Sequence, residues 1–152
     1  MLSRRGVRWN LMFVEFGHFS VVLAMMLSLV QTSIGFLGAR KGWINWINAT
    51  NVTAALQFVL TFTGFCFLVF SFANSDFSVK LVAMHSHTLK PLLYKLSGTW
   101  GNHEGSMLLW VLILTFYGFL VSRFGSNLPV KFRGYVLAVQ GLISFFFFVF
   151  LI

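Results

Sequence analysis

Four long apolar stretches constrain the fold of this chain more than any other feature of its sequence. They cover approximately residues 14–37, 52–73, 105–122 and 134–152. A helix needs about 20 residues to cross the hydrocarbon core of a bilayer, so each stretch is of the right length to span it. A backbone in lipid must satisfy its own hydrogen bonds, and these stretches are far longer than barrel strands. The sequence therefore predicts an all-α integral membrane protein with about four transmembrane helices.

The charge of the chain supports this fold class. Of its 152 residues, 58% are hydrophobic and only 9% are charged, whereas a soluble domain carries about a quarter charged residues. The net charge of +8 arises from eleven Lys and Arg residues against Glu15, Asp76 and Glu104. The cations form short clusters beside the apolar stretches, where anionic lipid headgroups favour them. This placement predicts contact with membrane lipid and no nucleic-acid partner.

The segments between the spans differ in length. We interpret residues 1–13 as a basic N-terminal arm, residues 38–51 and 123–133 as short basic loops, and residues 74–104 as one long external loop. Lys and Arg are denser in the short loops, which favours the cytoplasm or mitochondrial matrix for those loops and the opposite side for residues 74–104. Within the long loop, one apolar face predicts a short amphipathic helix lying in the membrane interface, formed by Leu89, Leu92, Leu93 and Leu96.

A first candidate site lies at the head of the first apolar stretch, where Glu15 and His18 are three residues apart. That spacing places both side chains on one face of a helix. Ionisable groups near lipid are costly and often functional. A structural alternative stays open, because both groups also suit the membrane surface and a Glu suits a helix N-terminus.

A second candidate precedes the third stretch and comprises Trp100, Gly101, His103, Glu104, Gly105 and Ser106. One interpretation is a capping turn, in which Glu104 and Ser106 satisfy free N–H groups of the helix and Trp100 anchors it in the interface. The other is a surface that meets haem or a partner protein. The two glycines allow either a tight turn or close approach of a ligand.

No catalytic residue and no metal site is predicted. His85 and His87 could face the same way in an extended segment, but two histidines without a third ligand are a weak signal. Cys66 is the sole cysteine, which excludes a disulfide within the chain, a C-x-x-C redox pair and a cysteine metal cluster. In an apolar stretch such a cysteine is usually a small hydrophobe.

Three segments resemble the N-terminal part of the CcmF family, the haem-attachment proteins of cytochrome c maturation. They are Glu15 to Ala24, Asp76 to Val79 and, most specifically, Tyr94 to Trp110. The resemblance implies that residues 14–152 form a CcmF-like N-terminal membrane domain. It also implies work on haem together with a haem chaperone and apocytochrome c, with residues 74–104 facing the periplasm or the intermembrane space.

The chain also departs from that family. The family's Trp-rich haem-binding segment and axial histidines lie downstream of its fourth helix, and the five tryptophans here form no such segment. We therefore expect a fragment or split subunit of a haem lyase that is not catalytic alone and binds no haem by itself, with other membrane chains supplying the rest. The alternative is a CcmF-derived structural subunit of a respiratory or other inner-membrane complex. The expected location is the mitochondrial inner membrane, with an organelle gene favoured, or the bacterial plasma membrane.

Overall fold

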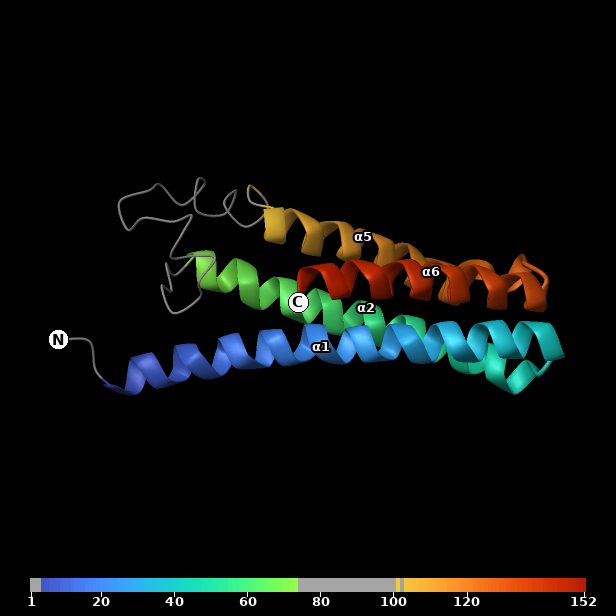
Figure 1. Ribbon diagram of the computed structural model, residues 1–152, viewed down its shortest axis with the longest axis horizontal. Coiled ribbons are helices and arrows are strands. Elements are labelled where there is room, and N and C mark those ends of the chain that lie inside the picture. The colour runs from blue at the N-terminus through green and yellow to red at the C-terminus, as the bar shows by residue number, and fades with distance from the viewer. Residues whose placement is uncertain (1–3, 74–100, 102) are drawn as a thin grey trace.

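The structure is a computed structural model that describes residues 4–73, 101 and 103–152. Its described part contains four long helices and one short 3-10 helix. They are α1 (Arg4–Lys41), α2 (Ile44–Ala73), α5 (His103–Phe124), η1 (Gly125–Asn127) and α6 (Val130–Leu151). Successive long helices run antiparallel, so the α1–α2 and α5–α6 turns lie at the same end of the bundle (Figure 1). Helix α1 packs against α2 and α6, and α5 packs against the same two helices.

All four long helices contain a segment long and apolar enough to cross a membrane. These segments are Glu15–Lys41, Ile44–Ser71, Gly105–Asn127 and Val130–Leu151. Their number and approximate positions confirm the prediction of four apolar helices. The predicted interfacial helix at Leu89 to Leu96 and nearly all of the loop from 74 to 104 lie outside the described residues.

The first short loop was predicted too long. Helix α1 continues to Lys41 and α2 begins at Ile44, so Gly42 and Trp43 alone connect them and Trp46 lies on α2. Gly42 adopts a left-handed φ of 72°, and the N–H of Trp43 donates to the carbonyl oxygen of Gly38 at 3.0 Å. This is the Schellman ending of a helix, in which a glycine reverses the chain within two residues.

The other predicted boundaries also move outward. Helix α5 extends to Phe124 and α6 begins at Val130, directly after Pro129, so Lys131 and Arg133 belong to α6 and not to the turn. At the N-terminus, α1 begins at Arg4 and includes most of the segment interpreted as a basic arm. Lys131 and Arg133 thus lie on a helix that extends beyond its apolar stretch, which hydropathy alone does not reveal.

Small and polar side chains make up much of the bundle interior, beside apolar ones such as Leu137 and Phe148, and large apolar side chains cover the outside. A Cβ added at Gly35 would lie 2.8 Å from the Cβ of Ala138, so α1 and α6 are in close contact there. Close approach of backbones through small residues is typical of helices that associate in membranes. The exposed side chains include Phe19, Leu56 and Phe146, which suits lipid as the surrounding solvent.

Candidate functional site

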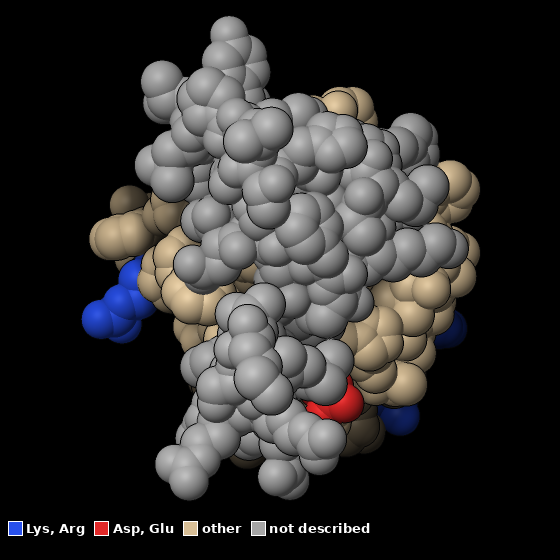
Figure 2. All heavy atoms as spheres, turned by 90° about the vertical axis from the view of Figure 1, so that its left-hand side faces the viewer, with Lys and Arg blue, Asp and Glu red and all other residues tan. Residues whose placement is uncertain are grey.

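The two predicted candidate segments lie at the same end of the bundle. Glu15 and His18 lie near the start of the apolar part of α1, and α5 begins at His103, at the same end (Figure 1). His103 and Glu104 are the first two residues of α5, Gly101 is exposed, and Trp100 lies outside the described residues. Figure 2 shows the molecule from this end, where an acidic (red) side chain is visible among uncharged described residues.

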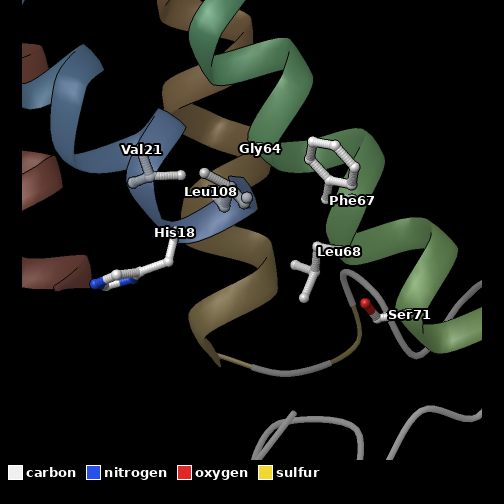
Figure 3. A pocket seen from close by; sticks show the side chains of 8 residues that line it. His18, Val21, Gly64, Phe67, Leu68, Ser71 and Leu108 are labelled. Carbon is white, nitrogen blue, oxygen red and sulfur yellow. The ribbon is translucent and has the colours of Figure 1, made fainter. Parts of the chain in front are cut away.

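A hollow of about 200 Å³ lies between α1, α2 and α5 at this end. Its walls are mostly apolar and are lined by Gly17, His18, Val21, Gly64, Phe67, Leu68, Ser71 and Leu108; Figure 3 labels all of these except Gly17. A Cβ at Gly64 would lie 2.7 Å from Cγ2 of Val21, and one at Gly17 would lie 3.0 Å from Cβ of Phe67. The two glycines therefore allow α1 and α2 to pack closely where they line the hollow.

Glu15 and His18 do not form a reactive pair within the described residues. Both side chains are exposed on α1. The imidazole of His18 points away from Phe67, Leu68 and Ser71, which line the other side of the hollow (Figure 3). No ion pair joins Glu15 and His18 among the described residues.

The hollow lined by these described residues does not have the form of a haem pocket. A haem pocket needs an axial ligand that points into it, and the imidazole of His18 points away from the far wall of the hollow (Figure 3). The volume of about 200 Å³ is below the roughly 300–1,000 Å³ of typical ligand pockets. Within the described part of the chain, no three metal-ligating side chains come together. His85 and His87 lie outside the described residues.

Ser106 does not line this hollow. It borders a second, apolar groove between α5 and α6, of about 380 Å³, together with Met107, Trp110, Phe147 and Phe150. Gly105 is buried. The segment from Gly101 to Ser106 therefore leads into a helix whose first turns contact both hollows, through Leu108 on one side and Ser106 on the other.

A buried cluster of polar side chains, which sequence reasoning missed, joins the helices at mid-height. This glutamine cluster consists of Gln31, Gln57, Gln140 and Ser144. Nε2 of Gln31 donates to Oε1 of Gln140 at 2.6 Å and to the carbonyl oxygen of Leu137 at 2.8 Å. Nε2 of Gln140 donates to Oγ of Ser144 at 3.0 Å and lies 3.5 Å from Oε1 of Gln57. Helices α1, α2 and α6 are thereby linked.

Helix α5 joins the glutamine cluster through its backbone. A Cβ at Gly118 would lie 2.7 Å from Cδ of Gln140, so the amide of Gln140 packs directly on α5. Oε1 of Gln31 and Nε2 of Gln57 are buried and have no hydrogen-bond partner among the described residues. One signal for this cluster was present in the sequence: three apolar stretches each carry a single glutamine. Polar groups inside a membrane usually face the bundle interior.

The opposite end of the bundle is basic. Both turns lie there, flanked by Arg40, Lys41, Arg123, Lys131 and Arg133. Nζ of Lys41 lies 4.4 Å from the centroid of the Trp43 ring, and the rings of Trp43 and Trp46 pack edge to face with centroids 5.0 Å apart. Aromatic rings and cations at one end of a membrane bundle suit the headgroup region.

Comparisons with known proteins agree on one family. Residues 100–152 match the model of the family described as cytochrome C assembly protein. The chain is 51% identical over 141 residues to the cytochrome c-type biogenesis protein ccl1 of Rhodobacter capsulatus, covering 93% of this chain and 22% of that protein. It is 43% identical over 141 residues to the cytochrome c-type biogenesis protein CcmF of Pseudomonas aeruginosa, again covering 93% of this chain and 22% of the relative.

A solved structure matches the chain to the same family. The cytochrome c haem lyase CcmF matches this fold with a TM-score of 0.84 and 31% sequence identity, over 90% of this chain and 23% of that one. The chain thus spans about a fifth of the length of the relatives that it matches.

Proposed function

The chain belongs to the CcmF family of cytochrome c-type biogenesis proteins, and from this premise we propose that it supplies the N-terminal membrane domain of a CcmF-type haem lyase. The observation that carries the proposal is the match along almost the whole chain, 51% identical over 93% of its residues. The fold agrees, with a TM-score of 0.84 to the haem lyase CcmF.

The rest of the haem lyase is part of this proposal. The chain spans about a fifth of its relatives' length, and its described residues offer no haem pocket. We therefore propose that this domain works as a fragment or split subunit, beside CcmF-type sequence that handles the haem. The haem chaperone and apocytochrome c are the proposed partners of the complete assembly, and haem is its cofactor.

We propose that the end of the bundle where α5 begins meets these partners. The candidate surface comprises Trp100, Gly101, His103, Glu104, Gly105 and Ser106. It is supported by position, because α5 starts at His103 beside the hollow that His18 and Leu108 line. In this arrangement residues 74–104 face the periplasm or the intermembrane space, opposite the basic end. Four membrane-spanning helices and bacterial relatives support a bacterial plasma membrane, and the mitochondrial inner membrane is the other proposed location.

Gentle purification tests this assignment. The tagged chain, extracted from its own membranes in a mild detergent, should bring with it CcmF-type sequence beyond this domain and the haem chaperone, identified by mass spectrometry. The matched control is an unrelated four-helix membrane protein with the same tag. Recovery of respiratory subunits without any cytochrome c maturation protein would instead favour a structural role.

A further inference from the structure

The outward faces of α1, α2 and α6 suit lipid in the middle of the membrane. Their exposed side chains there are apolar, as at Met26, Val59 and Ile143. The exposed Ser33 on α1 fits the same pattern, because its hydroxyl donates to the carbonyl oxygen of Leu29 at 2.8 Å and needs no partner outside its helix. Acyl chains satisfy these faces without hydrogen bonds.

The outward face of α5 is different. Tyr117 is 61% exposed and lies near the middle of the apolar segment Gly105–Asn127. Its ring contacts that of Phe116, 6.1 Å away between centroids, but its hydroxyl makes no hydrogen bond with any described residue. Tyr normally sits at the membrane interface. A hydroxyl left unpaired in hydrocarbon costs several kcal/mol on alkane scales, about 4–8.

Tyr117 belongs to a continuous strip of α5. Trp110, Ile113 and Tyr117 are spaced i, i+3 and i+7 and therefore share one face of the helix. All three are exposed, and Trp110 is 64% exposed. Towards the end of the bundle where α5 begins, the strip borders the groove that Trp110 forms with Met107 and Phe147. Large aromatic anchors beside an open groove are typical of protein interfaces.

We propose that this strip of α5 docks a further transmembrane helix of the CcmF-type assembly, one that presents a hydrogen-bonding group opposite Tyr117 at mid-membrane. The inference rests on the proposed function. Lipid acyl chains offer no acceptor to a phenol, whereas a helix offers polar side chains or backbone carbonyls. The relatives extend far beyond this domain, which covers 22% of their length, so the family has sequence outside this domain that could supply such a helix.

Photo-crosslinking tests the docking surface in intact membranes that contain the whole assembly. A benzophenone amino acid replaces Tyr117 or Ile113, and matched probes replace Val59 on α2 and Ile143 on α6, which are also exposed. The α5 probes should give a protein adduct that contains CcmF-type sequence outside residues 1–152, and the matched probes should give mainly lipid adducts. Lipid adducts alone at both α5 positions, or adducts only with a second copy of this chain, would overturn the proposal.

A conservative substitution isolates the hydrogen bond. Tyr117→Phe should lower co-purification of the remaining CcmF-type sequence about threefold, because interhelical hydrogen bonds in membranes average about 0.6 kcal/mol. Tyr135→Phe is the matched control on α6, since it also removes one phenol hydroxyl, and it should leave recovery unchanged. Equal recovery in both variants would reject the hydrogen bond. If the unmodified chain recovers CcmF-type sequence but the α5 probes give only lipid adducts, this inference alone is rejected. If the unmodified chain recovers no CcmF-type sequence, the proposed function is rejected.

Discussion

At the scale of single residues, Gln140 is the side chain on which the most helices converge. Its amide meets Gln31 of α1, Gln57 of α2 and Ser144 on its own helix, and it packs on Gly118 of α5. Apolar side chains gain little by meeting one another in lipid, so interhelical hydrogen bonds and close packing decide which faces associate. The glutamine cluster therefore specifies how the four helices are arranged, which the apolar outer faces do not.

Replacing Gln140 tests this role. Gln140→Leu removes three side-chain hydrogen bonds, so we expect a loss of about 1–2 kcal/mol in the free energy of unfolding, measured by steric trapping in bicelles. The neighbouring exposed residue provides the control, and Val139→Leu should change stability by less than about 0.5 kcal/mol. Adding Gln31→Leu to Gln140→Leu should cost less than the sum of the single changes. Additive losses would show that the two amides act independently.

His103 and Glu104 are the residues that distinguish a helix start from a partner surface. If Glu104 only stabilises the start of α5, the Glu104→Gln variant should retain most of that stabilisation, because the lost helix-dipole interaction is worth only about 0.3–1 kcal/mol. We expect instead that Glu104→Gln and His103→Ala strongly lower cytochrome c maturation while the chain still accumulates in the membrane. Haem staining of c-type cytochromes and immunoblots of the chain measure both. Normal cytochrome c maturation in both variants would reject the partner surface and leave the segment as a capping turn of α5.

At the scale of helices, the sequence predicts the spans well and their ends poorly. Length and hydropathy are local properties, so four apolar helices follow from them directly. The α1–α2 loop was predicted too long at residues 38–51, because Trp43 and Trp46 suited the headgroup region, whereas the single Gly42 ends α1. The alternation of four spans also predicts that Glu15 and the segment before Ser106 share one end. The hollow between them depends on Gly17 and Gly64 packing against side chains distant in sequence, which no local pattern encodes.

The orientation of the helices is a prediction at this same scale. With Cys66 replaced by serine, Ser75→Cys should react with an impermeant thiol reagent added from the periplasmic or intermembrane side. Ser126→Cys, in the exposed turn at the basic end, should react only after the membrane is permeabilised, because cations favour the cytoplasmic or matrix side. The reverse labelling pattern would reject the orientation and weaken the proposed contact with apocytochrome c.

At the scale of the whole molecule, we propose that the chain is a scaffold domain that does not bind haem by itself. The imidazole of His18 is exposed and points away from the far side of the hollow at its end of the bundle. The purified chain alone should therefore lack the absorption spectrum of a six-coordinate haem after incubation with haem. A spectrum corresponding to nearly one haem per chain would contradict this and give the domain a direct role in holding the cofactor.

Covalent haem attachment in the living cell tests the central claim most directly. The chain is depleted in the organism that encodes it, and c-type cytochromes are assayed by haem staining of denaturing gels beside immunoblots of the apoproteins. The proposed function predicts that covalent haem in c-type cytochromes falls while their apoproteins are still made and b-type cytochromes persist, with recovery when the chain is restored. Unchanged covalent haem after complete depletion would contradict a role for this CcmF-type domain in haem attachment.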